Sequence, residues 1–222
     1  HNDNRLLIWL DDAPELQGVP VIAKRSMVLL PGEFGSDPYY WVGHLIAIVE
    51  DLGLLPPQRE AMIDACALLQ EGATAYGPAS PTHRNSSKRV AGQFMDRMPV
   101  VYGSGLLAPV AQHWKTQLNT RARMFAAAES MPELVHSSVF GYEHAADVWR
   151  RAIVIALRCG HDLAADSALF DATRTALLEA GINQDTITAR GNSPLAQMMN
   201  MMQYGDWVAY YTAVMKGTNP KR

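Results

Sequence analysis

A short apolar run that ends in a glycine turn most constrains the fold of this chain. Residues 99–102 (PVVY) have the composition of a strand, and Gly103-Ser104-Gly105 interrupts them. A helical pattern follows at once, because apolar residues recur at intervals of three and four from Leu106 to Leu118. Strand, glycine turn and helix form the first half of a βαβ unit, so we expect a parallel sheet.

The glycine turn also has a chemical consequence. The first N–H groups of a helix have no intrahelical partners and the helix dipole is positive at that end, so such a turn can bind an anion. Gly103, Ser104 and Gly105 are therefore candidate ligand-binding residues. The same residues also suit an ordinary tight connection without a ligand, since a short glycine turn is a weaker cue than a full phosphate-binding fingerprint.

Strand-like and helix-like segments alternate through the rest of the chain. Strands are predicted at 99–102, 122–127, 152–158 and 185–190. An amphipathic helix is predicted at 166–180, where Gly181 ends it, and a short methionine-rich core helix at 198–202. This alternation indicates an α/β fold with a parallel sheet of about five strands and helices on both faces.

The first 84 residues have a different organisation. Short strands are predicted at 5–10, 19–23 and 26–30, and helices at 40–52 and 57–71. Residues 72–84 are rich in Gly, Pro, Ser and Thr and read as a linker, after which Asn85 or Ser86 caps the next helix. We therefore divide the chain into residues 1–84 and a domain at 85–222.

The composition is that of an ordinary globular chain. Of its 222 residues, 48% are hydrophobic and 18% are charged, which supplies ample core material. A net charge of −3 and a pI near 6.2 give no support for a nucleic-acid partner. The sequence shows no apolar run of membrane-spanning length and no signal peptide, so we expect a cytoplasmic protein without a membrane partner.

The cysteines and histidines do not indicate a metal site. Cys66 and Cys159 lie in apolar segments, which favours buried free thiols. The histidines lack the paired spacings that are typical of zinc sites. We expect neither a metal nor another cofactor.

Several motifs in order carry a resemblance to a known family. They lie at 99–103, 106–111, 114–117, 132–136, 141–143, 205–208 and 216–220. These motifs resemble the second half of the bifunctional phosphoglucose/phosphomannose isomerases, which consist of two sugar isomerase (SIS) domains. The resemblance covers about residues 20–222. It implies an SIS-type, flavodoxin-like domain at 85–222, preceded by crossing helices and a remnant of a first SIS domain, and it implies a homodimer.

The resemblance also implies a reaction, the aldose–ketose isomerisation of hexose 6-phosphates. The reaction needs a phosphate clamp, a base for the C1–C2 proton transfer, a group that stabilises the enediolate and an acid/base that opens the ring. In the family the base is a Glu in an Asn-His-Asn-Glu motif after Pro-Glu-Leu. Here that segment reads Val135-His136-Ser137-Ser138. Ser138 thus holds the base position, and a serine hydroxyl is too weak a base without an activating partner.

Other family positions can be assigned in the same way. An Arg that faces the reacting carbons corresponds to Tyr39, and a ring-opening histidine corresponds to His161, which equally suits a surface loop. His136 matches the motif histidine and is a candidate ligand-binding residue, although a hydrogen-bonded structural role also fits. Glu133 and Glu143 are alternative bases if the loop is rearranged.

Three functions are compatible with these residues. We favour a protein that binds a phosphorylated sugar but has lost isomerase chemistry. The alternatives are an active isomerase with altered residues and a dimerisation or interaction module without a ligand. The Ser-x-Ser-Gly-x-Thr loop that holds phosphate in the family's first SIS domain does not occur in these residues.

Overall fold

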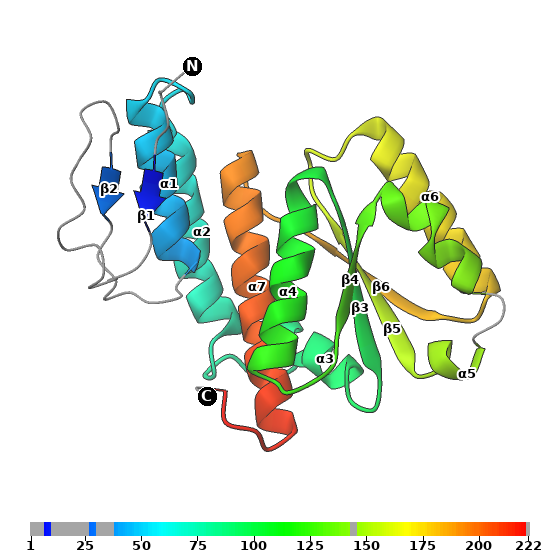
Figure 1. The fold of residues 1–222 in the computed structure, drawn as a ribbon. Helices are drawn as coiled ribbons and strands as arrows, with labels where there is room; N and C mark the ends of the chain where they lie inside the picture. Colours follow the sequence, from blue (N-terminus) through cyan, green and yellow to red (C-terminus); the bar gives the residue numbers. More distant parts are fainter. Residues whose placement is uncertain (1–6, 10–26, 30–37, 143–145, 221–222) are drawn as a thin grey trace. The chain divides into compact units, whose positions relative to one another are not determined.

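The computed structural model describes residues 7–9, 27–29, 38–142 and 146–220. The chain divides into two compact units, residues 1–58 and 59–222 (Figure 1). The division at 84/85 that was drawn from the linker composition stays a prediction.

The first unit contains two short strands and one helix. β1 (Leu7–Trp9) and β2 (Met27–Leu29) lie within the strands predicted at 5–10 and 26–30, and they pair in parallel. α1 (Pro38–Asp51) confirms the helix predicted at 40–52. The helix ends because Gly53 adopts a φ of +70°, which lets the Leu54 N–H bond the Val49 carbonyl at 3.0 Å. The strand predicted at 19–23 lies outside the described residues.

The second unit is built on a parallel sheet. Its strands are β3 (Met98–Ser104), β4 (Ala127–Met131), β5 (Ala152–Arg158) and β6 (Asn183–Thr188), in the order β4-β3-β5-β6. All neighbouring pairs are parallel, and Tyr102 of β3 lies opposite Glu129 of β4 and Ala156 of β5. The predicted α/β class is confirmed. The sheet has four strands in the described part of the chain, one fewer than expected.

Helices cover both faces of this sheet. The helices of this unit are α2 (Arg59–Tyr76), which packs against α7, then α3 (Ser86–Gln93), α4 (Ala108–Thr120), the short α5 (Ala146–Trp149), α6 (Ala164–Glu179) and α7 (Pro194–Met215). α4 and α7 lie on one side of the sheet, and α6 lies on the other (Figure 1). On the α6 side, Tyr102 and Val154 belong to one buried cluster with Phe170. Alternate strand side chains such as Val101 and Ile155 point to the opposite face and are fully buried.

β4 begins five residues later than predicted, at Ala127 rather than at 122. Arg123 has a φ of +49°, which interrupts the extended backbone after α4. The side chain of Asn119 then bonds both backbone groups of Ala126, at 3.1 Å to its carbonyl and 3.2 Å to its N–H. These groups are thereby satisfied without a strand partner. β6 likewise lies two residues earlier than the predicted 185–190.

α2 is longer than predicted and extends into the segment that reads as a linker. Its last residue, Tyr76, is buried, and its carbonyl accepts hydrogen bonds from the Tyr211 hydroxyl at 2.6 Å and from Asn85 Nδ2 at 2.8 Å. Asn85 also caps α3 as predicted, because its Oδ1 accepts from the Lys88 N–H at 3.1 Å. Cys66 on α2 is exposed, so the expectation of a buried thiol is wrong there, whereas Cys159 is buried.

α7 has 22 residues, so the prediction of a short helix is wrong. Ser193 caps it by accepting the Ala196 N–H at 3.1 Å. At its centre Gly205 lies against the indole of Trp114 on α4, and a Cβ at this position would overlap the ring. The indole Nε1 donates to the Met201 carbonyl at 2.9 Å. α7 is mostly buried, because it packs against α2 and α3 as well as against α4.

Candidate functional site

The turn after β3 is fixed by its two glycines. Gly103 is buried, and a Cβ there would overlap the carbonyl of Leu107 in the 3₁₀ turn η3 (Gly105–Leu107). Gly105 has a φ of +42°, which L side chains rarely adopt. The chain therefore passes from β3 through η3 into α4, the strand–turn–helix arrangement predicted from the sequence. Whether Gly103, Ser104 and Gly105 bind a ligand stays a prediction.

A buried carboxylate after β5 is tied to this turn. Asp162 has a side chain that is only 4% exposed, and its Oδ2 accepts from Arg158 Nε at 2.7 Å. The Cys159 N–H donates to the same oxygen at 3.2 Å, and the Ser104 hydroxyl donates to Oδ1 at 3.4 Å. Asp162 thus links the loop after β5 to the turn after β3.

Arg158 and Cys159 complete this cluster. Arg158 Nη2 donates to the Ser167 hydroxyl at 2.8 Å, and its guanidinium lies 4.6 Å from the centre of the Phe170 ring. Burial, followed by the hydrogen bond from Sγ to Asp162, raises the pKa of the Cys159 thiol to about 11. The thiol is therefore a protonated donor near neutral pH and not a nucleophile.

The loop after β4 carries the motif segment. It consists of η4 (Glu133–His136) and η5 (Ser138–Gly141), after a cis peptide bond before Pro132. Glu133 accepts the Ser130 hydroxyl at 3.0 Å, and its carboxylate is exposed. Tyr142, directly after η5, bonds the Tyr102 hydroxyl at 2.7 Å in the core, and burial raises the pKa of both phenols.

The candidate residues of the sequence fall on three neighbouring loops. Ser104 is the last residue of β3, His161 lies in the loop after β5 next to Asp162, and His136 and Ser138 follow β4. Since β4, β3 and β5 are adjacent and parallel, these loops share the carboxyl edge of the sheet, where open α/β sheets bind ligands. Among the described residues no hydrogen bond joins His136 or Ser138 to the Ser104–Asp162 cluster. Tyr39 belongs to α1 of the other unit.

Sequence reasoning missed Asp162 and Arg158. The signal was present in the sequence, because Arg158 directly follows the apolar run 152–157 and Asp162 comes four residues later. A polar pair at the end of a buried strand is a usual mark of a ligand edge. Glu143, the second alternative base, lies outside the described residues.

The described residues offer no metal centre of ordinary composition. No group of three or more His, Cys, Asp or Glu side chains among them could hold a metal ion. No helix in the described ranges is long and apolar enough to cross a membrane. The side chains described at the carboxyl edge offer hydroxyls, imidazoles, the exposed Glu133 carboxylate and the Arg158–Asp162 ion pair.

Comparisons with known proteins agree with this architecture. The bifunctional phosphoglucose/phosphomannose isomerase of Caldicellulosiruptor bescii is 26% identical over 179 residues, which are 79% of this chain and 52% of that protein. The enzyme of the same description from Aquifex aeolicus is 25% identical over 186 residues, 84% of this chain and 55% of that protein. A glucose-6-phosphate isomerase like protein from Thermus thermophilus has the same fold, with a TM-score of 0.65 at 22% identity over 78% of this chain and 57% of its own.

The extent of these matches defines which part of the relatives this chain represents. It spans about half the length of the curated relatives that it matches. Residues 83–222, well over half of the chain, match the family described as bacterial phospho-glucose isomerase C-terminal SIS domain. With its four-stranded parallel sheet and its glycine turn at the carboxyl edge, the chain belongs to this family of SIS domains.

Proposed function

We propose that this chain binds a phosphorylated sugar at the carboxyl edge of its sheet and does not isomerise it. The observation that carries the proposal is the side chain at the family's base position. Ser138 is half-buried in η5, and no described residue forms a hydrogen bond with its hydroxyl. Without a partner that removes its proton, a serine cannot act as the base.

Binding is supported by the turn after β3. Gly103 leaves no room for a Cβ beside Leu107, Gly105 has a φ that L side chains rarely adopt, and the Ser104 hydroxyl donates to Asp162. A phosphoryl group or sugar hydroxyls near this turn would meet backbone N–H groups at the start of η3 and α4. The neighbouring His136 and His161 are exposed and supply imidazoles at the same edge.

The expected reduction in the isomerisation rate can be estimated from the two replaced residues. Loss of a general base alone reduces the rate by about 10²–10⁴, and loss of the electrostatic partner at the position of Tyr39 by a further factor of about 10². An active isomerase would need Glu133, whose exposed carboxylate lies in the same loop as Ser138.

Two experiments separate binding from catalysis. Titration with glucose 6-phosphate should shift the amide resonances of 103–105 and 136–138, and unchanged resonances there would overturn the binding site. A coupled assay should show no turnover, whereas a rate near the typical enzyme value of about 10 per second would overturn the loss of activity. In that case Glu133→Gln identifies whether Glu133 is the base.

A gain-of-function variant gives the constructive test. Ser138→Glu combined with Tyr39→Arg restores both family residues, and Ser137→Glu with Tyr39→Arg is the matched control, because Ser137 is the exposed neighbour. Activity in the first variant only would show that these two residues were missing. Absence of isomerase activity in both variants would show that the chain differs from the active family members at further residues.

The association and location of the chain are part of the same proposal. We propose a homodimer, with contact surface either from the aromatic residues of α1, such as Trp41, or from those of α7, such as Trp207. Light scattering that gives a monomer at high micromolar concentration would contradict it. A cytoplasmic location accords with a phosphorylated sugar as ligand, and cell fractionation tests it.

A further inference from the structure

A polar cavity of about 540 Å³ lies on the opposite side of the sheet from α6. Its walls come from α3, β6 and α7, and β6 pairs only with β5 in the described part of the chain. The groups that matter in it are Ser86, Arg89, Gln93, Asp185, Arg190 and Tyr204. Pockets of this size commonly hold small molecules.

The cavity has an excess of positive charge, although the chain as a whole is acidic. Arg89 is exposed, and no described acid lies within ion-pair distance of it. Arg190 pairs with Glu71 at 3.1 Å, but both side chains are more than half exposed, and such surface pairs are weak. Asp185 is the one carboxylate of the lining. It is already bonded by Gln93 Nε2 at 3.1 Å and by the Thr186 N–H at 2.8 Å.

Neutral donors and acceptors complete the lining. Burial raises the pKa of Tyr204 to about 12 against the opposing hydrogen bond from Ser86, so its hydroxyl keeps its proton near neutral pH. The Gln93 Oε1 atom is buried, and no donor among the described residues reaches it. An unsatisfied buried acceptor in a cavity wall is a recognised sign of a missing water or ligand group.

The cavity beneath α6 has a different balance of positive and negative charge. It measures about 450 Å³ and is lined by Arg158 and Arg174 and by Asp171 and Asp185, of which Asp185 lines both cavities. Arg158 is moreover neutralised by Asp162. That cavity has no excess charge with which to hold an anion.

We propose that the α3–β6–α7 cavity binds a small molecule that carries both a phosphoryl group and hydroxyl groups. Arg89 and Arg190 hold the phosphoryl oxygens, because guanidinium groups match their geometry. Tyr204 donates a further hydrogen bond, while Asp185 and Gln93 accept the ligand's hydroxyls. This site lies away from the glycine turn after β3 and does not depend on the function proposed for that turn. A sugar phosphate and a nucleotide share the required chemistry.

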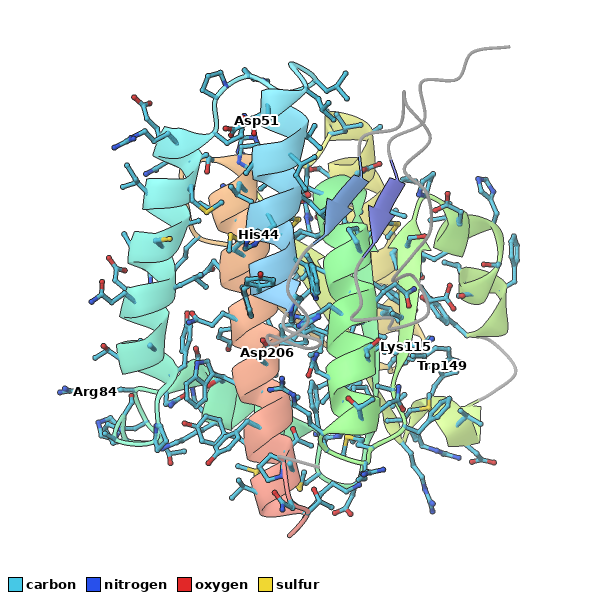
Figure 2. All side chains as sticks on the ribbon, turned by 60° about the vertical axis from the view of Figure 1, so that its left-hand side comes forward. His44, Asp51, Arg84, Lys115, Trp149 and Asp206 are labelled. Carbon is cyan, nitrogen blue, oxygen red and sulfur yellow. The ribbon has the colours of Figure 1, made fainter. Side chains whose placement is uncertain are left out.

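Calorimetric titration of the whole chain at low salt, with glucose 6-phosphate, adenosine monophosphate and inorganic phosphate as separate probes, tests this site. Arg89→Gln should weaken binding about tenfold or more, the usual loss for a charged hydrogen bond. Arg84→Gln is the matched control, because Arg84 lies just before α3 and projects away from the helices (Figure 2). It removes the same charge and should leave affinity unchanged. Tyr204→Phe should weaken binding severalfold, and circular dichroism checks that it folds.

The outcomes distinguish this site from the carboxyl edge. Ligand-induced amide shifts at Arg89 and Arg190 support the proposal, and the tighter of the two organic probes identifies the source of the phosphoryl group. Shifts confined to residues 103–105 and 136–138 overturn it while leaving the proposed function standing. Absence of saturable binding by all three probes at millimolar concentration overturns it too, as does equal weakening by Arg89→Gln and Arg84→Gln.

Discussion

Replacement of Gly205 by alanine tests the close packing of α4 and α7. A Cβ at 205 would overlap the indole of Trp114, which is completely buried and cannot move without disturbing its hydrogen bond to Met201. Overpacking of a core costs about 1–3 kcal/mol, and a lost buried hydrogen bond costs about 1 kcal/mol. Alanine regains about 1 kcal/mol of helix propensity. We expect Gly205→Ala to lower the free energy of unfolding by about 2 kcal/mol.

Urea unfolding followed by circular dichroism measures this loss. With a slope of about 2 kcal/mol per molar urea, the midpoint should fall by about 1 M. Gly92→Ala in α3 is the matched control, because a Cβ there has nothing within 4 Å and should stabilise the fold slightly. Trp114→Phe combined with Gly205→Ala should cost less than the sum of the two single changes, since the smaller ring leaves room. If Gly205→Ala matches Gly92→Ala, or if the two changes simply add, the packing argument is refuted.

The remaining predictions concern a cap and the two thiols. Asn85→Ala should lower the free energy of unfolding by about 2–4 kcal/mol, because it removes the α3 cap and the bond to the Tyr76 carbonyl; a loss under about 1 kcal/mol would contradict this. Iodoacetamide at pH 8, followed by mass spectrometry, should label exposed Cys66 and leave buried Cys159 unmodified. The Cys159 pKa is raised from 9.0 to about 11, so its contribution to stability is complete below pH 9 and lost as the pH rises through 11. Cys159→Ala should flatten the fall in stability over that window, and an unchanged slope would contradict the assignment.

The parts of the fold that were predictable are those in which local pattern and tertiary packing agree. β5 matches its predicted bounds because 152–158 is a continuous apolar run buried on both faces. The start of β4 was predicted five residues too early, because the composition of residues 122–126 suits a strand and a helix equally well. Their state is decided by the Asn119 side chain, a contact that no periodicity reveals. The length of α7 was missed because only the methionines at 198–202 were used to predict it, whereas the helix also passes through Gly205, which packs against Trp114.

The sequence predicted the residues of each candidate loop, but not the contacts between the loops. The glycine turn was found because its residues are consecutive and chemically distinctive. The link between Ser104 and Asp162 joins residues 58 positions apart, so it depends on the order of the strands. The same holds for Arg89 and Arg190, which reach one cavity from α3 and from the loop after β6.

The outer edge of β6 has a consequence for how copies of this chain can meet. A free strand edge offers unpaired backbone groups to any other strand, and long apolar edges promote fibrous aggregation. β6 reads Asn-Gln-Asp-Thr-Ile-Thr, short and almost wholly polar, with Asp185 in its middle. A second strand that paired with β6 would have to desolvate these polar side chains. It would also place its own side chains next to the Asp185 carboxylate. Within the described part of the chain the sheet therefore ends at β6, and two copies that associate are expected to do so through helices rather than by joining their sheets.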